Sequence, residues 1–242
     1  MHRIFINEDQ IENNQIYLNS DDFHHLARVQ RVKLKEKIEI VLNDKILLVE
    51  ILQILKNGFL FREIKTQFMN KIGYEIILAQ ALPKQDKFSE VLRLCLPLHV
   101  AQIIPVVTKR TVSRLDDHNL SHKFKRWQNV IKEVAAQAKL NFLAKLDMVV
   151  DFDEFIKNTD KKEILKIVLW EEEKNVSLKQ VLQLNKHYHS ILLFVGPEGG
   201  FSEEEITMLK QNGFLSVSLG DSILRTEQAG FFSLAAINYE FL

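Results

Sequence analysis

The sequence has few residues that could form cross-links, and it has no excess of either charge. It contains one cysteine, Cys95, among 242 residues, which excludes an internal disulfide and a cysteine-based zinc site. No apolar run approaches the ~20 residues needed to cross a bilayer, and Met1–Phe5 begins no apolar signal core. We therefore expect a cytoplasmic protein with no membrane association. No metal site is expected either, because the histidine pairs lie near no cluster of carboxylates or thiols.

The charges balance over the whole chain but not along it. The 32 basic and 32 acidic residues cancel, which is only weak support for a nucleic-acid partner. Residues 103–145, however, carry nine Lys or Arg against three Asp or Glu. Such a stretch can bind RNA phosphates, or it can be an ordinary solvated helix face.

The first part of the chain, residues 1–70, is predicted to be a small β-rich domain. Apolar segments of strand length surround the turn signal Asn43-Asp44, which predicts a hairpin. Ser20 or Asp21 is expected to cap a short helix. The predicted strands are Phe5–Ile6, Ile38–Leu42, Ile46–Ile51 and a segment near Phe59–Ile64.

From about Tyr74 onward, short apolar strands alternate with helical segments. This alternation predicts a second domain, residues 74–242, of the α/β class, with a mainly parallel sheet and helices on both faces. The predicted strands are Ile76–Ala79, Ile103–Val107, Ile164–Trp170, Ile191–Val195 and Val217–Leu219. The predicted helices are Ser121–Leu140, Ser177–Leu184, one beginning at Ser202 and Thr226–Tyr239.

Two loops between a strand and a helix carry the clearest functional signal. Gly196-Pro197-Glu198-Gly199-Gly200-Phe201-Ser202 follows a buried strand, and Ser202 with Glu205 forms a capping box. The second loop runs from Leu219-Gly220 to Arg225 and enters the helix at Thr226. Loops at the carboxyl ends of strands in one sheet form a ligand crevice. Taken alone, the first loop could equally be a plain turn, and it is neither a dinucleotide fingerprint nor a Walker A loop.

Taken together, the two loops closely resemble the S-adenosyl-L-methionine (AdoMet) motifs of the SPOUT methyltransferases. More narrowly, the chain resembles the ribosomal RNA small subunit methyltransferase E family. Other segments are similar to that family along nearly the whole chain, namely His24–Val32, Leu78–Lys84, Ile103–Pro105 and Arg126-Trp127.

The resemblance implies a fold and an activity. It implies a trefoil-knotted SPOUT domain preceded by a PUA-like β-barrel that binds RNA. It implies AdoMet-dependent methylation of N3 of a specific uridine in 16S rRNA of the small ribosomal subunit. It also implies a homodimer, and the apolar residues along Thr226–Tyr239 agree with a helix that is covered on more than one side.

The resemblance also assigns roles to residues. Arg225 is expected to stabilise the uracil anion, or else to brace the loops by pairing with Glu198 or Glu227. Glu198 and Glu227 are candidate general bases or loop-orienting groups. The expected cofactor-binding residues are Gly196, Pro197, Gly199, Gly200, Leu219, Gly220, Ile223, Leu224 and Ala229. The expected RNA-binding residues are Arg28, Arg31, Lys84 and Arg126.

The sequence departs from the family on the face expected to meet RNA. Leu94 replaces a lysine, and Leu96–His99 replaces a Thr-Glu-Leu-Gly tetrapeptide. Ala136, Ala138 and Leu140 replace a glutamate, a serine and an arginine. Two alternatives therefore stay open, a SPOUT methyltransferase with a different RNA target and an AdoMet-binding RNA-binding protein with little catalysis.

Overall fold

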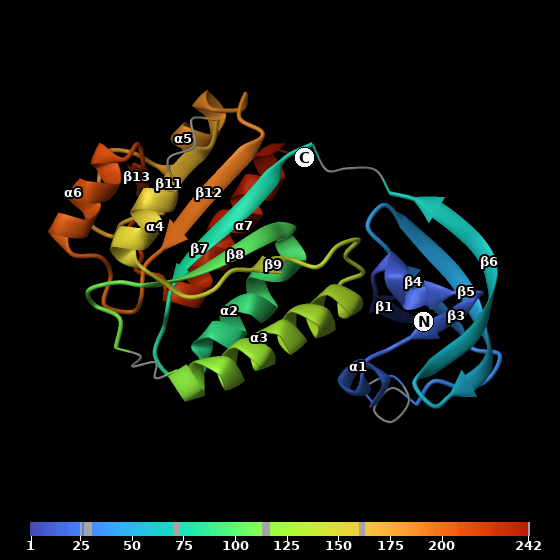
Figure 1. Ribbon diagram of the computed structural model, residues 1–242. Coiled ribbons are helices and arrows are strands. Elements are labelled where there is room, and N and C mark those ends of the chain that lie inside the picture. The colour runs from blue at the N-terminus through green and yellow to red at the C-terminus, as the bar shows by residue number, and fades with distance from the viewer. Residues whose placement is uncertain (25, 27–30, 70–72, 113–116, 160–162, 242) are drawn as a thin grey trace. The chain divides into compact units, whose positions relative to one another are not determined.

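The chain folds into two compact units, each of which is described by itself. A computed structural model describes residues 1–24, 26, 31–69, 73–112, 117–159 and 163–241. One unit comprises Met1–Lys71 together with Lys132–Leu143, and the other comprises Ile72–Ile131 together with Ala144–Leu242. Figure 1 shows their strands and helices in chain order.

The first unit is built on a six-stranded sheet with the order β1-β4-β5-β6-β3-β2. The pairs are antiparallel except β1 with β4. The sheet curls around a core of buried aliphatic and phenylalanine side chains, and two register shifts between β5 and β6 help to bend it. The strands are β1 His2–Phe5, β2 Ile11–Glu12, β3 Gln15–Tyr17, β4 Lys37–Val41, β5 Lys45–Leu55 and β6 Gly58–Phe68.

The local predictions for this unit are mostly confirmed. β4 and β5 form the hairpin expected around Asn43-Asp44, closed by a hydrogen bond from Leu42 N to Lys45 O of 2.9 Å. Helix α1 covers Ser20–His24, so Ser20 and Asp21 lie inside the helix and the prediction that one of them caps it was wrong. A short 3-10 helix, η1, covers Glu8–Gln10. The prediction of Phe5–Ile6 as the first strand was wrong in its bounds. The strand begins at His2, because His2–Phe5 pairs in parallel with Ile38–Val41.

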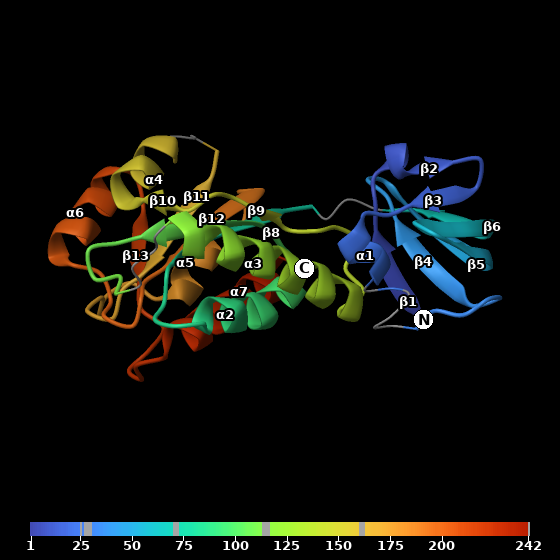
Figure 2. The ribbon, with the colours of Figure 1, turned by 60° about the horizontal axis from the view of Figure 1, so that its bottom comes forward.

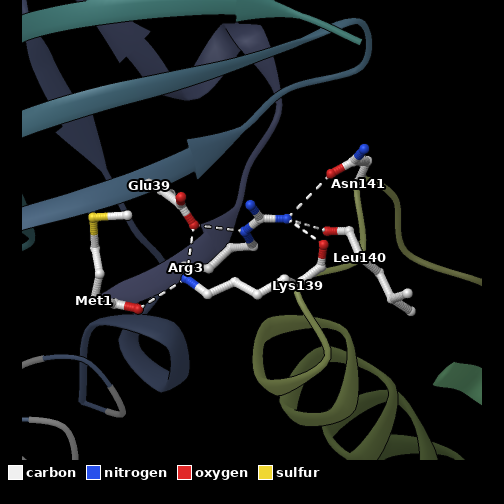
Figure 3. A network of polar contacts seen from close by, with 6 residues as sticks. All are labelled: Met1, Arg3, Glu39, Lys139, Leu140 and Asn141. Carbon is white, nitrogen blue, oxygen red and sulfur yellow. Dashed lines mark hydrogen bonds and ion pairs between the residues drawn. The ribbon is translucent and has the colours of Figure 1, made fainter. Parts of the chain in front are cut away.

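A buried arginine holds the end of helix α3, Asp117–Gln137, within the first unit (Figure 3). Arg3 Nη1 donates to the carbonyl oxygens of Lys139 and Leu140 at 2.6 and 2.8 Å, and Arg3 Nε pairs with Glu39 at 2.8 Å. Lys139 has a φ of 57°, so the helix stops before the predicted end at Leu140. The guanidinium therefore binds the carbonyls of two residues just beyond Gln137, the last residue of the helix.

The second unit contains a seven-stranded parallel sheet, as the alternating pattern predicted. The order is β10-β8-β7-β12-β11-β13, with β9 also paired to β8. The pairs recorded in this sheet are all parallel. The strands are β7 Glu75–Ala81, β8 Val100–Val107, β9 Lys145–Leu146, β10 Val150–Asp151, β11 Leu165–Leu169, β12 Ser190–Val195 and β13 Leu215–Val217.

Helices cover both faces of this sheet (Figure 2). Phe155 and Ile206, from α4 and α6, share a core with Phe194 on one face. On the other face α7 packs closely, since a Cβ added at Gly230 would lie 3.4 Å from Cys95 Sγ and 3.8 Å from Val195 Cγ2. The remaining elements of this unit are α2 Lys87–Cys95, the 3-10 helix η3 Leu96–Leu98, α4 Phe152–Asn158, α5 Leu178–Leu184, α6 Glu203–Gln211 and α7 Thr226–Phe241.

Capping explains where two of these helices begin. Ser177 and Ser202 each accept a hydrogen bond from the backbone three residues on and complete a capping box, as predicted.

The predicted strand Val217–Leu219 lies instead at Leu215–Val217. Ser218 leaves the ladder and forms only an isolated bridge to Ser177. In the described part of the chain, no helix is both long and apolar enough to cross a membrane.

Candidate functional site

The candidate site lies in the second unit, where the loops that follow β12 and β13 meet at one edge of the sheet. β12 lies between β7 and β11, and β13 lies beyond β11. The carboxyl ends of parallel strands share an edge, so the segments after β7, β11, β12 and β13 all emerge there. The geometry therefore brings the two predicted loops together.

The first loop, Gly196–Ser202, is a tight turn that requires glycine. Gly200 N donates to Pro197 O at 2.9 Å, and Gly200 has a φ of 65°, a left-handed value. A Cβ at Gly200 would lie 2.1 Å from a carboxylate oxygen of Glu171, the exposed residue two positions beyond the end of β11. The loop thus passes close to the segment that follows the neighbouring strand.

Neighbouring loops hold the first loop at two further points. Both oxygens of Glu198 accept from Lys84 N at 3.1 Å, and one lies 3.4 Å from Lys87 Nζ. Arg110 Nη1 donates to Gly199 O at 2.8 Å. The segments after β7 and β8 therefore brace the first loop, with Glu198 as one of the bracing groups.

The second loop is largely exposed between β13 and α7. Leu219 and Leu224 are half-buried, whereas Ile223 has 90% of its surface exposed. Gly220 has a φ of 112°. The apolar side chain of Ile223 is thus not covered by other described residues.

Arg225 stands at the N-terminus of α7 with its side chain exposed. Its backbone N donates to Gln228 Oε1 at 3.2 Å, and Arg225 O accepts the first helical bond, from Ala229 N at 2.8 Å. Within the described ranges, the structure records no ion pair between Arg225 and Glu198 or Glu227. The bracing alternative for Arg225 thus finds no support in these contacts.

Glu227 is enclosed in the first turn of α7, with 4% of its surface exposed. Its Oε2 has no hydrogen-bond partner among the residues that the structure describes. Glu227 differs in this respect from Glu198, whose two oxygens are both engaged.

The four predicted RNA-binding residues differ in their surroundings. Arg28 lies outside the described residues, and Arg31 and Lys84 are exposed. Arg126 donates to both carboxylate oxygens of Asp86 and lies 3.2 Å from Ser89 Oγ. The hydrogen bond with Asp86 raises the pKa of Arg126, and the same bond lowers the pKa of Asp86. The charge of Arg126 is therefore largely compensated within the second unit.

Sequence reasoning missed four residues that support the first loop. Lys87 and Arg110 contact it as described above, and Thr226 Oγ1 donates to Gly196 O at 2.6 Å and accepts from Gln80 Nε2 at 3.0 Å. Gln80 could have been noticed in the sequence, because it is a polar residue in an otherwise apolar strand. No sequence pattern pointed to Arg110, because its contact with Gly199 spans 89 positions. Cys95 is buried, and burial raises the pKa of its thiol to about 12. Among the described residues, no group of three or more His, Cys, Asp or Glu could hold a metal ion.

The chain is similar to known RNA methyltransferases. The model of the RNA methyltransferase domain family matches residues 70–238. Ribosomal RNA small subunit methyltransferase E 2 of Borreliella burgdorferi is 30% identical over 242 residues, covering 97% of this chain and 96% of that protein.

Solved structures match both units in one chain. A protein from Legionella pneumophila, solved in complex with the bound cofactor SAM, is 27% identical with a TM-score of 0.84, covering 98% of this chain and 96% of its own. The fold is also that of a ribosomal RNA small subunit methyltransferase E from Neisseria gonorrhoeae bound to S-adenosyl methionine. That structure has a TM-score of 0.86 and 23% identity, and the match covers 99% of this chain and 97% of that one.

Proposed function

The chain belongs to the ribosomal RNA small subunit methyltransferase E family, and from this premise we propose that it methylates N3 of a specific uridine in 16S rRNA with AdoMet. The observation that carries the proposal is the meeting of the two family loops at one edge of the parallel sheet. The Borreliella relative is named for small-subunit ribosomal RNA, which supports the substrate class.

The residues present fit the cofactor. In the glycine-rich loop, Gly196, Gly199 and Gly200 carry no Cβ, so the backbone on either side of Pro197 can approach a ligand closely. Leu219, Ile223 and Leu224 provide apolar surface suited to an adenine ring. We propose that these residues, together with Gly220 and Ala229, hold AdoMet. The cofactor, when bound, supplies the methyl group.

The chain's own residues must orient the uridine and stabilise its anion. N3 of uracil is mostly protonated at neutral pH, and its negative charge, once formed, spreads to the carbonyl oxygens. Arg225 has an exposed side chain next to the first loop, so we propose that it stabilises this charge. Of the two carboxylates, Glu227 retains an unengaged oxygen and is the better candidate for proton transfer. Glu198 is assigned to bracing the loop.

We propose that the first unit is the PUA-like RNA-binding domain (residues 1–70) and that residues 74–242 form the trefoil-knotted SPOUT domain. The family membership supports both assignments. Arg28, Arg31 and Lys84 are the proposed phosphate contacts. Arg126 contributes less to RNA affinity under this proposal, since Asp86 compensates its charge. Action on ribosomal RNA also implies a cytoplasmic location.

We further propose a homodimer that buries the exposed face of α7. Phe231, Phe232 and Tyr239 are 43%, 49% and 84% exposed, and Ala235 and Ala236 lie between them. Three large aromatic side chains on one helix are a typical interface composition.

Base-resolved mapping of 16S rRNA methylation tests the function. Cells without the protein are expected to lose one N3-methyluridine, and the wild-type gene is expected to restore it, whereas Arg225→Ala is not. If all 16S positions are unchanged, the same mapping on other cellular RNAs distinguishes an altered target from the alternative of binding with little catalysis. An unchanged 16S pattern would exclude the proposed substrate.

A further inference from the structure

Gln80 is a fully buried amide at the end of β7, inside the parallel sheet. Its Nε2 donates to Ala81 O at 2.9 Å and to Thr226 Oγ1 at 3.0 Å. Its Oε1 has no hydrogen-bond partner in the part of the chain that the structure describes. A buried acceptor without a partner opposes folding, and an aliphatic side chain would avoid it. Packing alone therefore does not explain a glutamine here.

The hydroxyl of Thr226 continues the hydrogen bonds toward the first loop. Thr226 Oγ1 donates to Gly196 O at 2.6 Å. A hydroxyl has a single proton, so the bond between Thr226 and Gln80 must use the amide as donor. The chain of donors runs from Gln80 through Thr226 to Gly196, and it joins β7, the start of α7 and the start of the first loop.

Thr226 directly follows Arg225, and few other contacts fix the position of Arg225. The recorded bonds of Arg225 are those of its backbone, to Gln228 and Ala229. The position of Arg225 relative to the first loop thus depends on where α7 begins. The bond from Thr226 to Gly196 sets that point directly.

We propose that Gln80 and Thr226 are positioning residues that hold Arg225 in register with the first loop during methyl transfer. The inference rests on the proposed function and deepens it. A displacement of about 1 Å at a reacting group can lower the rate about a hundredfold. Loss of this restraint is therefore expected to lower kcat more than it weakens cofactor binding.

Thr226→Val and Thr226→Ser test the hydroxyl, with Ser233→Ala as the matched control. Ser233 is a buried α7 hydroxyl with no partner among the described residues. With small ribosomal subunits as substrate, Thr226→Val should lower kcat at least about tenfold and change the KM for AdoMet less than about threefold. Thr226→Ser and Ser233→Ala should retain wild-type kcat within about threefold. A wild-type kcat in Thr226→Val, or equal losses in the valine and serine variants, would overturn the proposal.

The variant Gln80→Met separates an effect on the position of Arg225, measured as kcat, from an effect on the stability of the fold. It removes the donor and also the unpaired oxygen, at similar side-chain volume. The expected result is a melting temperature close to wild type with a kcat lowered about tenfold. If stability and kcat fall in parallel, the role is structural and the proposal fails.

Hydrogen exchange measured without RNA tests the restraint by Thr226 independently of the proposed methylation. In Thr226→Val, hydrogen exchange should quicken in peptides covering 196–201 and 225–229, while peptides from α4 stay unchanged. If wild-type protein methylates no small-subunit rRNA, the proposed function fails, and exchange still decides whether the restraint exists. Wild-type exchange rates in both loops would refute the inference.

Discussion

Arg225 is the residue on which the proposed methyl transfer depends most directly. Replacement by alanine should lower methyl transfer about a hundredfold, because loss of a charged donor at a developing anion costs about 3 kcal/mol. Binding of AdoMet should change little. Arg225→Lys should recover only part of the rate, since an ammonium lacks the planar pair of donors. Single-turnover methylation at saturating AdoMet, alongside calorimetry, measures both quantities. Equal losses in binding and turnover would instead indicate a structural role.

Gly200 and Gly199 are neighbours with different backbone requirements. Gly200→Ala should destabilise the protein by about 1 kcal/mol, because alanine is disfavoured at a φ of 65°. Glu171 would also have to turn away from the new methyl group. Gly199→Ala is the control, since its Cβ would make ordinary contact with Arg110 Cβ at 3.4 Å. Urea unfolding of both variants checks the difference, and equal midpoints would contradict it.

At the scale of the element, the end of α3 depends on Arg3. Arg3→Met should cost about 3 kcal/mol, because it leaves the buried carbonyl of Leu140, the part-buried carbonyl of Lys139 and part of the Glu39 charge without this partner. Arg62→Met is the control from the same unit. Arg62 is exposed and pairs with Glu50 at 2.5 Å, a kind of pair worth under about 1 kcal/mol. Chemical denaturation should separate the two variants, and similar losses would show that Arg3 has no special role.

The contacts of Glu39 with Arg3 and Lys139 also predict that the stability of the fold depends on pH. Burial raises the pKa of Glu39, but hydrogen bonds and charges from Arg3 and Lys139 outweigh it, so the net pKa is lowered. A carboxyl group with a lowered pKa stabilises the fold above its unfolded pKa, and this contribution is lost as the pH falls through the folded value. The stability gap between wild type and Glu39→Gln should therefore be largest near neutral pH and shrink in acid. A gap that is independent of pH would contradict the assignment.

At the scale of the molecule, the proposed dimer can be tested through α7. Phe232→Glu should shift the protein toward monomer, because a charge would enter an apolar interface. Met208→Glu is the control. Met208 is 38% exposed on α6, which covers the other face of the sheet. Sedimentation at micromolar concentration distinguishes the states. A monomeric wild type would refute the dimer, and an intact dimer in Phe232→Glu would place the interface elsewhere.

The sequence alone determined those features that depend on neighbours in the chain. The capping boxes at Ser177 and Ser202 and the hairpin at Asn43-Asp44 involve residues only two or three positions apart. The alternation of apolar strands and helices likewise predicted a parallel sheet, because parallel strands need a crossover helix between them. The motif loops were recognisable for the same reason.

The tertiary structure decided which polar groups meet. Gln80 and Thr226 are 146 positions apart, Glu198 and Lys84 are 114 apart, and Arg3 and Leu140 are 137 apart. Such partners depend on strand order and on where each helix ends. Lys139, one of the nine basic residues in the stretch 103–145, pairs with Glu39 at 2.9 Å. A local pattern specifies a helix end or a turn, but a side chain's distant partner exists only once the sheet has placed β7 beside β12.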